Sequence, residues 1–356
     1  MKILLTADPE LPVPPNLYGG IERIIALLVG EFLALGHEVG LVAHPDSNAQ
    51  STAFFPWPGK STRNYLDSWK NAMALHAAVR SFEADIIHSF SRLLWLIPLV
   101  FDPRPKIMSY QREPTGRTVR LSNHLHWGKL QFTGCSEYIC RNGRTRGGGR
   151  WTAIPNAVDL AGYRFQSNVP NDAPLVFLSR IEPIKGCDIA IEIAKRCGRR
   201  LLIAGNHAED GEAGTYWREK ILPEIGCNGI EYVGEVNDQQ KNELLGQAAA
   251  MIVPVQWDEP FGLVFIEALA CGTPVISCPR GALPEIVRDG ADGFLINGID
   301  EGCSAVEKIQ SLDRHECRKR VEVEFSSAVI AKEYVHLYER VLGSYLNRDK
   351  VFSSHT

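Results

Sequence analysis

Two glutamates, Glu259 and Glu267, are separated by seven residues that can form a loop followed by a helix. Apolar runs at residues 252–255 and 274–277 predict a buried strand on each side of that segment. In such a unit, the loop amides and the helix N-terminus point at any anion above the sheet edge. We expect Glu259 in the loop and Glu267 about two turns into the helix, with both carboxylates free to accept hydrogen bonds from hydroxyl groups. The alternative is an ordinary amphipathic helix with one exposed and one capping glutamate.

A second group of charged residues follows another predicted strand, at residues 175–179. Arg180 and Lys185 lie in the loop after that strand, before a helix predicted from Asp188 to Arg196. Arginine binds phosphate oxygens through a planar fork, and lysine adds a compact charge. Their position at a strand end favours an anion site over the alternative, which is a loop with solvated surface charges.

The first half of the chain begins with a strand, a loop and a helix. The apolar run Lys2–Thr6 predicts the strand, residues 21–33 have helical periodicity, and Glu38–Ala43 predicts the next strand. Gly19 and Gly20 lie just before the helix and would let the backbone approach a sugar or phosphate closely. A simple tight turn is the alternative. The dinucleotide-binding pattern G-x-G-x-x-G is absent from this unit.

Further strands in this half are predicted near residues 84–88 and 106–110 and continue to residue 154. Strands that alternate with helices indicate an α/β fold with a parallel sheet covered on both faces. Ligands bind at the carboxyl ends of such strands, so His88 and Gln111, which fall at two of these ends, are acceptor-side candidates. Gln111 can bond a hydroxyl group but cannot act as a base. A structural role is the alternative for His88.

The composition limits the class of protein. A length of 356 residues favours two domains, at about 100–200 residues per domain. The net charge of −4 gives no sign of a nucleic-acid partner. The N-terminal apolar run is too short for a signal peptide, and no segment reaches the ~18 apolar residues of a membrane span. Nine cysteines without a C-x-x-C pair indicate a reduced, cytoplasmic location rather than disulfides or a zinc site.

Positive charge is concentrated in residues 104–150. Ten Lys or Arg residues lie there against two acidic residues, Glu113 and Glu137, an excess of eight in a chain that is acidic as a whole. One interpretation is an anionic acceptor or a membrane surface, since each basic residue near anionic lipid contributes about 1 kcal/mol. The alternative is a set of solvated loops, with residues 141–150 a mobile link between a helix and a strand.

The segment around Glu259 resembles the E-x7-E motif of retaining glycosyltransferases of family 4, also known as glycosyl transferases group 1. The resemblance rests on Glu-Pro-Phe-Gly-Leu-Val from Glu259, Cys-Gly-Thr-Pro-Val from Cys271 and Pro-Asn-Ala-Val-Asp from Pro155. It implies the GT-B fold, in which two Rossmann-like parallel-sheet domains face a cleft.

The same resemblance implies the domain limits. Residues 1–165 would form the acceptor-binding domain and residues 174–327 the nucleotide-sugar-binding domain, with the polar residues 166–172 as the linker. A last helix at about residues 328–356 would pack back onto the first domain.

Roles for individual residues are implied as well. Arg180 and Lys185 would neutralise the departing diphosphate, as catalytic residues. Glu259, the third catalytic residue, would bind hydroxyl groups of the donor sugar, and Glu267 would bind the ribose. The further donor contacts implied are Gly19, Gly20, Tyr232, Val233, Phe261, Gly262, Leu263 and Val264.

The activity implied is that of a hexosyltransferase that uses a nucleotide-diphosphate sugar, UDP-glucose or a similar UDP-hexose. The acceptor would be a glycan, a lipid-linked molecule or a small molecule, as in polysaccharide biosynthesis, either anionic or membrane-associated. In the latter case the enzyme would lie at the inner face of the membrane. No cofactor and no metal are implied, since the donor is a substrate and no Asp-x-Asp lies at a strand end. Retention would proceed by front-face attack, with a diphosphate oxygen taking the acceptor proton.

The sequence departs from the family on the acceptor side, where Gln111 stands in place of a common histidine. Three alternatives follow. A sugar-nucleotide epimerase of related fold would need acid/base residues in the first half. A phosphorylase would need a phosphate site in place of nucleotide recognition. A catalytically weak subunit would bind a nucleotide-sugar without transferring it.

Overall fold

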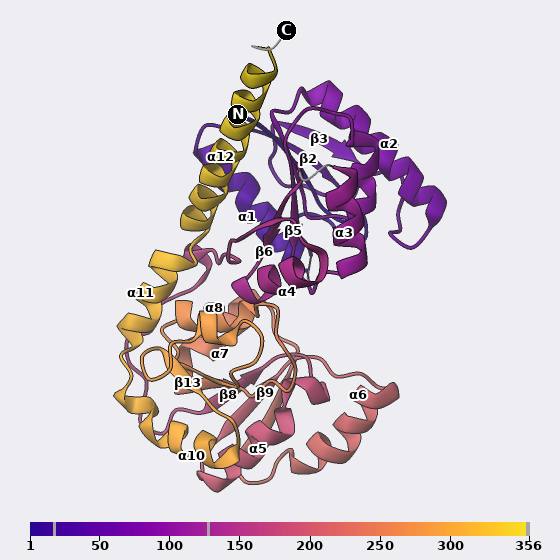
Figure 1. Ribbon diagram of the computed structural model, residues 1–356. Helices are drawn as coiled ribbons and strands as arrows, with labels where there is room; N and C mark the ends of the chain where they lie inside the picture. Colours follow the sequence, from indigo (N-terminus) through magenta and orange to yellow (C-terminus); the bar gives the residue numbers. More distant parts are fainter. Residues whose placement is uncertain (17–18, 127–128, 354–356) are drawn as a thin grey trace. The chain divides into compact units, whose positions relative to one another are not determined.

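Two parallel sheets organise the chain, one in each of two units (Figure 1). The computed structural model describes residues 1–16, 19–126 and 129–353. The first unit consists of Met1–Ala157 together with the C-terminal helix that starts at Ser327, and the second unit is Val158–Ser326. The predicted α/β fold with two parallel-sheet domains is therefore confirmed.

The sheet of the first unit has, within the described residues, seven parallel strands in the order β3-β2-β1-β4-β5-β6-β7. They are β1 Lys2–Thr6, β2 Glu38–Ala43, β3 Ala53–Pro56, β4 Ile86–Ser89, β5 Lys106–Tyr110, β6 Gln131–Gly134 and β7 Arg150–Ala153. Ile3, Leu4 and Leu5 of the central strand β1 have no exposed surface, as expected for a parallel sheet covered on both faces. Because β1, β4 and β5 are neighbours, their carboxyl ends meet at one edge of the sheet.

The helices of the first unit are α1 Gly20–Ala34, α2 Tyr65–Phe82, the 3-10 helix η1 Leu93–Leu99, α3 Gly116–Leu125, α4 Glu137–Gly147 and α12 Ser327–Ser353. Ser136 caps the N-terminus of α4, since its hydroxyl accepts a hydrogen bond from the Ile139 amide at 3.3 Å. The interpretation of residues 141–150 as a mobile link is therefore wrong for the helical part of this segment. Its glycines allow close packing instead, since a Cβ at Gly143 would lie 2.2 Å from the Trp151 ring.

Helix α12 lies alongside α1 and is part of the core of the first unit (Figure 1). Tyr338 has no exposed surface, and its ring centroid lies 5.6 Å from that of Phe32. Its hydroxyl group lies 2.6 Å from Nδ1 of His88 in β4. The helix ends at Ser353, and the last residues of the predicted range, 354–356, lie outside the described residues.

The second unit begins earlier than the predicted limit at residue 174. The Val158 amide donates to the Phe325 carbonyl oxygen at 2.9 Å, and the Gln166 amide donates to that of Cys271 at 3.0 Å. The Arg314 side chain also donates to the Gln166 carbonyl oxygen, at 2.7 Å. Residues 158–166 are therefore bonded to the second unit, although residues 158–165 were predicted to end the first domain and residue 166 to begin the linker.

The second unit, described throughout, has six parallel strands in the order β10-β9-β8-β11-β12-β13. They are β8 Leu175–Leu178, β9 Leu201–Ala204, β10 Ile230–Gly234, β11 Ala250–Val253, β12 Val275–Ser277 and β13 Gly293–Leu295. Its α-helices are α5 Cys187–Arg196, α6 Gly211–Tyr216, α7 Asp238–Gln247, α8 Leu263–Ala270, α9 Leu283–Ile286, α10 Ile299–Lys308 and α11 Arg314–Glu324. Its short 3-10 and π segments are η2 Leu160–Gly162, η3 Pro183–Lys185, η4 Trp217–Ile221, η5 Leu222–Glu224 and η6 Ile309–Ser311. Among the described helices of both units, none is long and apolar enough to cross a membrane.

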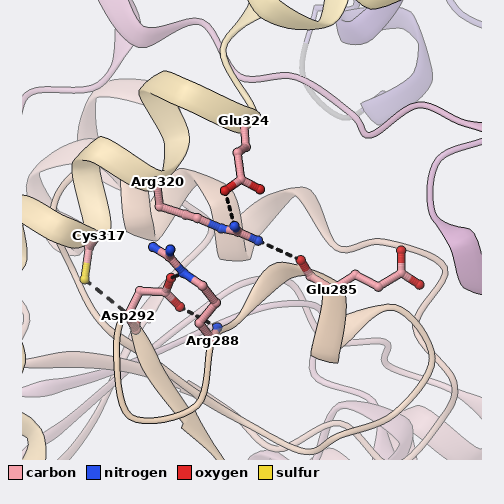
Figure 2. A network of polar contacts seen from close by, with 6 residues as sticks. All are labelled: Glu285, Arg288, Asp292, Cys317, Arg320 and Glu324. Carbon is pink, nitrogen blue, oxygen red and sulfur yellow. Dashed lines mark hydrogen bonds and ion pairs between the residues drawn. The ribbon is translucent and has the colours of Figure 1, made fainter.

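A network of polar contacts fixes α11 and the segment between α9 and β13 (Figure 2). The Asp292 carboxylate has no exposed surface and accepts hydrogen bonds from the backbone amide and Nε of Arg288, at 2.7 and 2.8 Å. The Cys317 thiol contacts the Asp292 carbonyl oxygen, and Arg320 donates to the carbonyl oxygen of Glu285 at 2.9 Å. Every partner belongs to the second unit, so this network is a structural support within it.

Candidate active site

Lys185 and Glu259 form a buried ion pair in the second unit. Lys185 ends η3 after β8, and Glu259 lies in the loop between β11 and α8. Because β8 and β11 are neighbouring parallel strands, these two loops meet at one sheet edge. Lys185 Nζ lies 2.6 Å from Glu259 Oε2, and the two residues are 9% and 8% exposed. The structure therefore brings together two of the three predicted catalytic residues.

Trp257 completes this pair and was missed by the sequence analysis. Its indole Nε1 donates to Glu259 Oε2 at 2.9 Å, and Lys185 Nζ lies 4.8 Å from the centre of its ring. One oxygen of Glu259 thus has two donors, while Oε1 has no hydrogen bond from a residue that the structure describes. The only signal in the sequence was an aromatic residue two positions before Glu259.

The backbone of Glu259 is held by the loop before α9. The Ala282 amide donates to the Glu259 carbonyl oxygen at 2.8 Å. Gly281 has a φ of +61°, and a Cβ there would lie 2.3 Å from that same oxygen. Only glycine fits this conformation and this close approach together. The residue therefore positions the loop that carries the glutamate.

The N-terminus of α8 lies directly after the Glu259 loop. Gly262 caps it in the left-handed conformation, and the helix begins with Leu263 and Val264. The first amides of a helix have no intrahelical acceptor and carry the positive end of its dipole. Phe261 is 4% exposed, with its ring centroid 6.1 Å from that of Phe325, so its side chain packs in the core.

Glu267 lies further along α8 and forms an ion pair with Lys241. It is the fifth residue of the helix, so it is about one turn in rather than the predicted two. Its Oε1 accepts a hydrogen bond from Lys241 Nζ at 2.8 Å. Burial raises the pKa of the Tyr163 hydroxyl, and the nearby Glu267 carboxylate raises it further. Lys241 and Tyr163, which no motif identified, thus surround this carboxylate.

Arg180, the third predicted catalytic residue, is exposed and pairs with its neighbour. Nη1 of Arg180 lies 2.7 Å from Oε1 of Glu182, with the two side chains 47% and 26% exposed. Such a surface pair contributes little to stability, so the guanidinium can turn towards a ligand at little cost.

The predicted donor contacts Tyr232 and Val233 lie in β10. The Tyr232 hydroxyl donates to the Gly205 carbonyl oxygen at 2.9 Å, and Val233 is 43% exposed. The Tyr232 ring contacts Trp217 at 4.8 Å between centroids, and Trp217 stacks on His207 at 4.1 Å with an interplanar angle of 3°. The sequence did not identify this cluster of three rings, because its members lie on different elements.

Gly19 and Gly20 belong to the first unit, where they begin α1. A Cβ at Gly19 would lie 2.7 Å from Cβ of Pro15 and 2.9 Å from Oε2 of Glu22. Packing within the loop is therefore sufficient reason for a glycine at position 19. The contact of Gly19 and Gly20 with a donor stays a prediction.

His88 has a structural position, so the prediction that it contacts an acceptor is corrected. The residue has no exposed surface. Its Nδ1 lies 2.6 Å from the Tyr338 hydroxyl and its Nε2 lies 2.6 Å from the Ser109 hydroxyl. Burial lowers the pKa of His88 to about 3, which keeps the ring neutral. Both ring nitrogens are therefore used inside the core.

Gln111, by contrast, lines a cavity of about 130 Å³ in the first unit. The cavity lies where β1, β4 and β5 end. Its lining residues are Asp8, Ile21, Phe90, Met108, Ser109, Tyr110, Gln111 and Arg112. The sequence analysis missed Asp8, whose only signal was an acidic residue two positions after the first strand.

Part of the basic segment 104–150 is neutralised locally. Arg144 and Arg146 form ion pairs with Glu137 and Glu113, the two acidic residues of the segment. Lys106 is buried and donates to two backbone carbonyl oxygens, and burial lowers its pKa to about 8. The charge excess available to a partner is therefore smaller than the sequence suggested.

Two family models together match most of the chain. Residues 18–161 match the model described as Glycosyltransferase Family 4, and residues 162–322 match Glycosyl transferases group 1. The D-inositol 3-phosphate glycosyltransferase of Mycolicibacterium smegmatis is 33% identical over 196 residues, which are 54% of this chain and 44% of that protein. The protein of the same name from Mycobacterium marinum is 34% identical over 143 residues, 39% of this chain and 30% of that protein. Each match thus spans less than half of the curated relative.

Solved structures are similar over almost the whole chain. AviGT4, a glycosyltransferase involved in avilamycin A biosynthesis, is 26% identical with a TM-score of 0.71 and covers 96% of this chain and 98% of its own. HepE from Anabaena, crystallised with UDP and glucose, is 18% identical with a TM-score of 0.72 and covers 95% of this chain and 99% of its own. At that identity, the second likeness concerns the fold alone.

Proposed function

The chain belongs to glycosyltransferase family 4 and has the GT-B fold, and from this premise we propose that it transfers a sugar from a nucleotide-diphosphate sugar to a hydroxyl group with retention of configuration. The donor proposed is a UDP-hexose such as UDP-glucose. A protein of the same fold has been crystallised with UDP and glucose, which supports this class of donor.

The observation that carries the proposal is the buried Lys185–Glu259 pair beside the N-terminus of α8. Burying an ion pair is costly and contributes little to stability, so the presence of a buried pair at the sheet edge favours a functional role over a stabilising one. A diphosphate would compete with Glu259 for the Lys185 ammonium. Glu259 would then turn its second oxygen to donor-sugar hydroxyls, while the Trp257 indole keeps the carboxylate oriented.

Charge develops on the diphosphate as the sugar leaves. Lys185, Arg180 and the first amides of α8 are the groups proposed to stabilise that charge, as preorganised donors do in other active sites. These groups supply the positive charge that a divalent metal would otherwise provide. We therefore expect full transfer activity in the presence of EDTA. Dependence on added Mg²⁺ or Mn²⁺ would contradict this part of the proposal.

Retention is proposed to follow from attack on the face that the diphosphate leaves. The acceptor oxygen forms its bond to the anomeric carbon as the bond from that carbon to the diphosphate oxygen breaks. The acceptor proton passes to that diphosphate oxygen, so no enzyme base is required. This scheme is compatible with Gln111, which cannot take a proton.

The nucleotide end of the donor is proposed to lie along α8 and β10. Glu267 would accept hydrogen bonds from the ribose hydroxyls, and the base would lie near Tyr232 and Val233. The half-buried Tyr232 ring supports a flat ligand in this region, because aromatic faces stack favourably.

The acceptor is proposed to be anionic or membrane-associated, and the protein to act at the cytoplasmic face of a membrane in the latter case. Arg117 and Arg141 are exposed, and their side chains form no hydrogen bond or ion pair with any described residue. The curated relatives are named for inositol 3-phosphate, which carries a phosphate group. Both observations support an acceptor with negative charge.

The test is to incubate the protein with UDP-glucose and to measure free UDP with and without acceptor extracts. Acceptor-dependent release of UDP is the expected result. Appearance of an epimer without acceptor would support a sugar-nucleotide epimerase. UDP-glucose binding without any release would support a nucleotide-sugar-binding subunit.

A further inference from the structure

The cavity at the ends of β1, β4 and β5 contains a carboxylate that the proposed reaction does not use. Asp8 lies two residues beyond β1, and its Oδ1 is buried without a hydrogen bond from any described residue. A buried acceptor without a donor is costly, and native proteins leave few of them. Asp8 also lines the cavity, so its carboxylate borders space that a ligand can occupy.

We propose that Asp8 binds the acceptor: its carboxylate accepts a hydrogen bond from a hydroxyl group of a sugar or cyclitol ring held in this cavity. Gln111 lines the same cavity and can both donate to and accept from further hydroxyl groups. This inference rests on the proposed function, because it assigns the acceptor side of the same reaction.

Four charged side chains surround Asp8, two carboxylates and two guanidinium groups. Glu10 and Glu22 face it from the loop after β1 and from α1, while Arg92 and Arg112 face it from the segments after β4 and β5. The two arginines equal the two neighbouring carboxylates in number, so the ionised Asp8 leaves one net negative charge, but no described group of His, Cys, Asp and Glu is arranged to hold a metal ion. A hydroxyl group, in contrast, donates a hydrogen bond without adding charge to this site.

The protonation of Asp8 makes the inference measurable. Burial, and then the carboxylates of Glu10 and Glu22, raise the pKa of Asp8 to about 7, against the lowering effect of the two arginines. The remaining titratable lining residues are Tyr110, whose pKa is raised to about 12 by burial, and Arg112. Asp8 is therefore the described lining group that changes charge near neutral pH. A hydroxyl donor prefers the ionised form, so ring binding should weaken as pH falls below 7.

The first experiment measures binding without turnover. Ligand-observed NMR would follow myo-inositol and methyl α-D-glucoside with the full chain at pH 8 and pH 5.5. Wild-type protein should bind at least one probe, more strongly at pH 8, and Asp8→Asn should bind about 10- to 100-fold more weakly with no pH dependence. Glu10→Gln is the matched control, because Glu10 is exposed, bonds Thr62 and does not line the cavity. It should keep the binding and shift its midpoint to lower pH.

The second experiment separates this inference from the proposed function. With UDP-glucose saturating and an acceptor that supports release of UDP, Asp8→Asn should raise the KM for the acceptor and leave UDP binding unchanged. Asp8→Glu should retain the pH dependence. Binding of neither probe by wild-type protein, or a wild-type KM and pH profile in folded Asp8→Asn, would overturn the inference. Probe binding that depends on Asp8, without any release of UDP, would overturn the proposed function alone.

Discussion

Lys185 and Glu259 share one hydrogen bond in a site where neither has much access to water. The pair positions these two side chains rather than stabilising the fold. Removal of either partner would leave the other charge buried without compensation. When Glu259 is replaced by glutamine, the Trp257 indole can still donate a hydrogen bond to the uncharged side-chain amide oxygen. Glu259→Gln is therefore the most informative substitution at the site.

Glu259→Gln should lower kcat for transfer by about 100- to 1000-fold, because the amide binds donor-sugar hydroxyls less well and disturbs the Lys185 contact. UDP has no sugar, so its dissociation constant should change little. Kinetics of UDP release and calorimetry of UDP binding test the two halves of this prediction. Glu182→Gln is the control, since it removes only the half-buried carboxylate that pairs with Arg180. Wild-type turnover of Glu259→Gln would remove Glu259 from the mechanism.

Asp8 should reduce the stability of the protein at neutral and alkaline pH. Its pKa in the folded chain, about 7, lies above the ordinary value of 3.8, so the folded state binds the proton more tightly than the unfolded state. The free energy of unfolding therefore falls as pH rises from about 4 to about 7, and the loss is complete above that range.

Asp8→Asn removes this ionisation, so it should raise Tm by about 2–8 °C at pH 8 and by much less at pH 5. Thermal unfolding of both proteins at the two pH values measures the difference. Glu38→Gln, at an exposed carboxylate of the same unit, is the control. An equal or lower Tm for Asp8→Asn at pH 8 would contradict the burial of an unpartnered carboxylate.

At the scale of elements, loops at the sheet edge hold the site, and the loop before α9 holds Glu259. Gly281 and Gly290 allow a matched comparison, because both have a positive φ, +61° and +74°. A Cβ at Gly281 would meet the Glu259 backbone, whereas nothing lies within 4 Å of a Cβ at Gly290. Both substitutions carry similar backbone strain, of about 1–2 kcal/mol.

Gly281→Ala should therefore lower kcat/KM for transfer by about 100-fold, because it displaces Glu259, while Gly290→Ala should only lower Tm. Thermal unfolding of both variants measures the backbone strain, and steady-state kinetics measures the effect of displacing Glu259. Equal activity of the two variants would show that the loop before α9 does not position the glutamate.

At the scale of the whole molecule, the proposed donor site belongs to the second unit except for Gly19 and Gly20. UDP should therefore slow amide hydrogen exchange in residues 180–186, 230–234 and 259–267. Hydrogen exchange with mass spectrometry on the full chain measures this, with α2 of the first unit as the internal control. Protection confined to the first unit would contradict the assignment of the donor to the second.

The order of strands and helices was predictable because it depends on local patterns. Apolar runs and turn residues placed β1, β2, α1 and β5 correctly, and the residues around Glu259 identified the family. The glycine-rich part of α4 was misjudged, since its glycines serve close packing against Trp151 rather than mobility. That distinction depends on a contact between elements, which composition does not reveal.

The sequence by itself determined the fold class, the family and the residue types of the proposed donor site, since these follow from local periodicity and motif spacing. Only the tertiary structure decided how those residues pair. Lys185 contacts Glu259 across 74 positions, and His88 is enclosed by Tyr338 across 250. Burial and pKa depend on such distant neighbours. For that reason the sequence suggested His88 and overlooked Asp8, whereas the folded chain buries the histidine and places the carboxylate at the edge of a cavity.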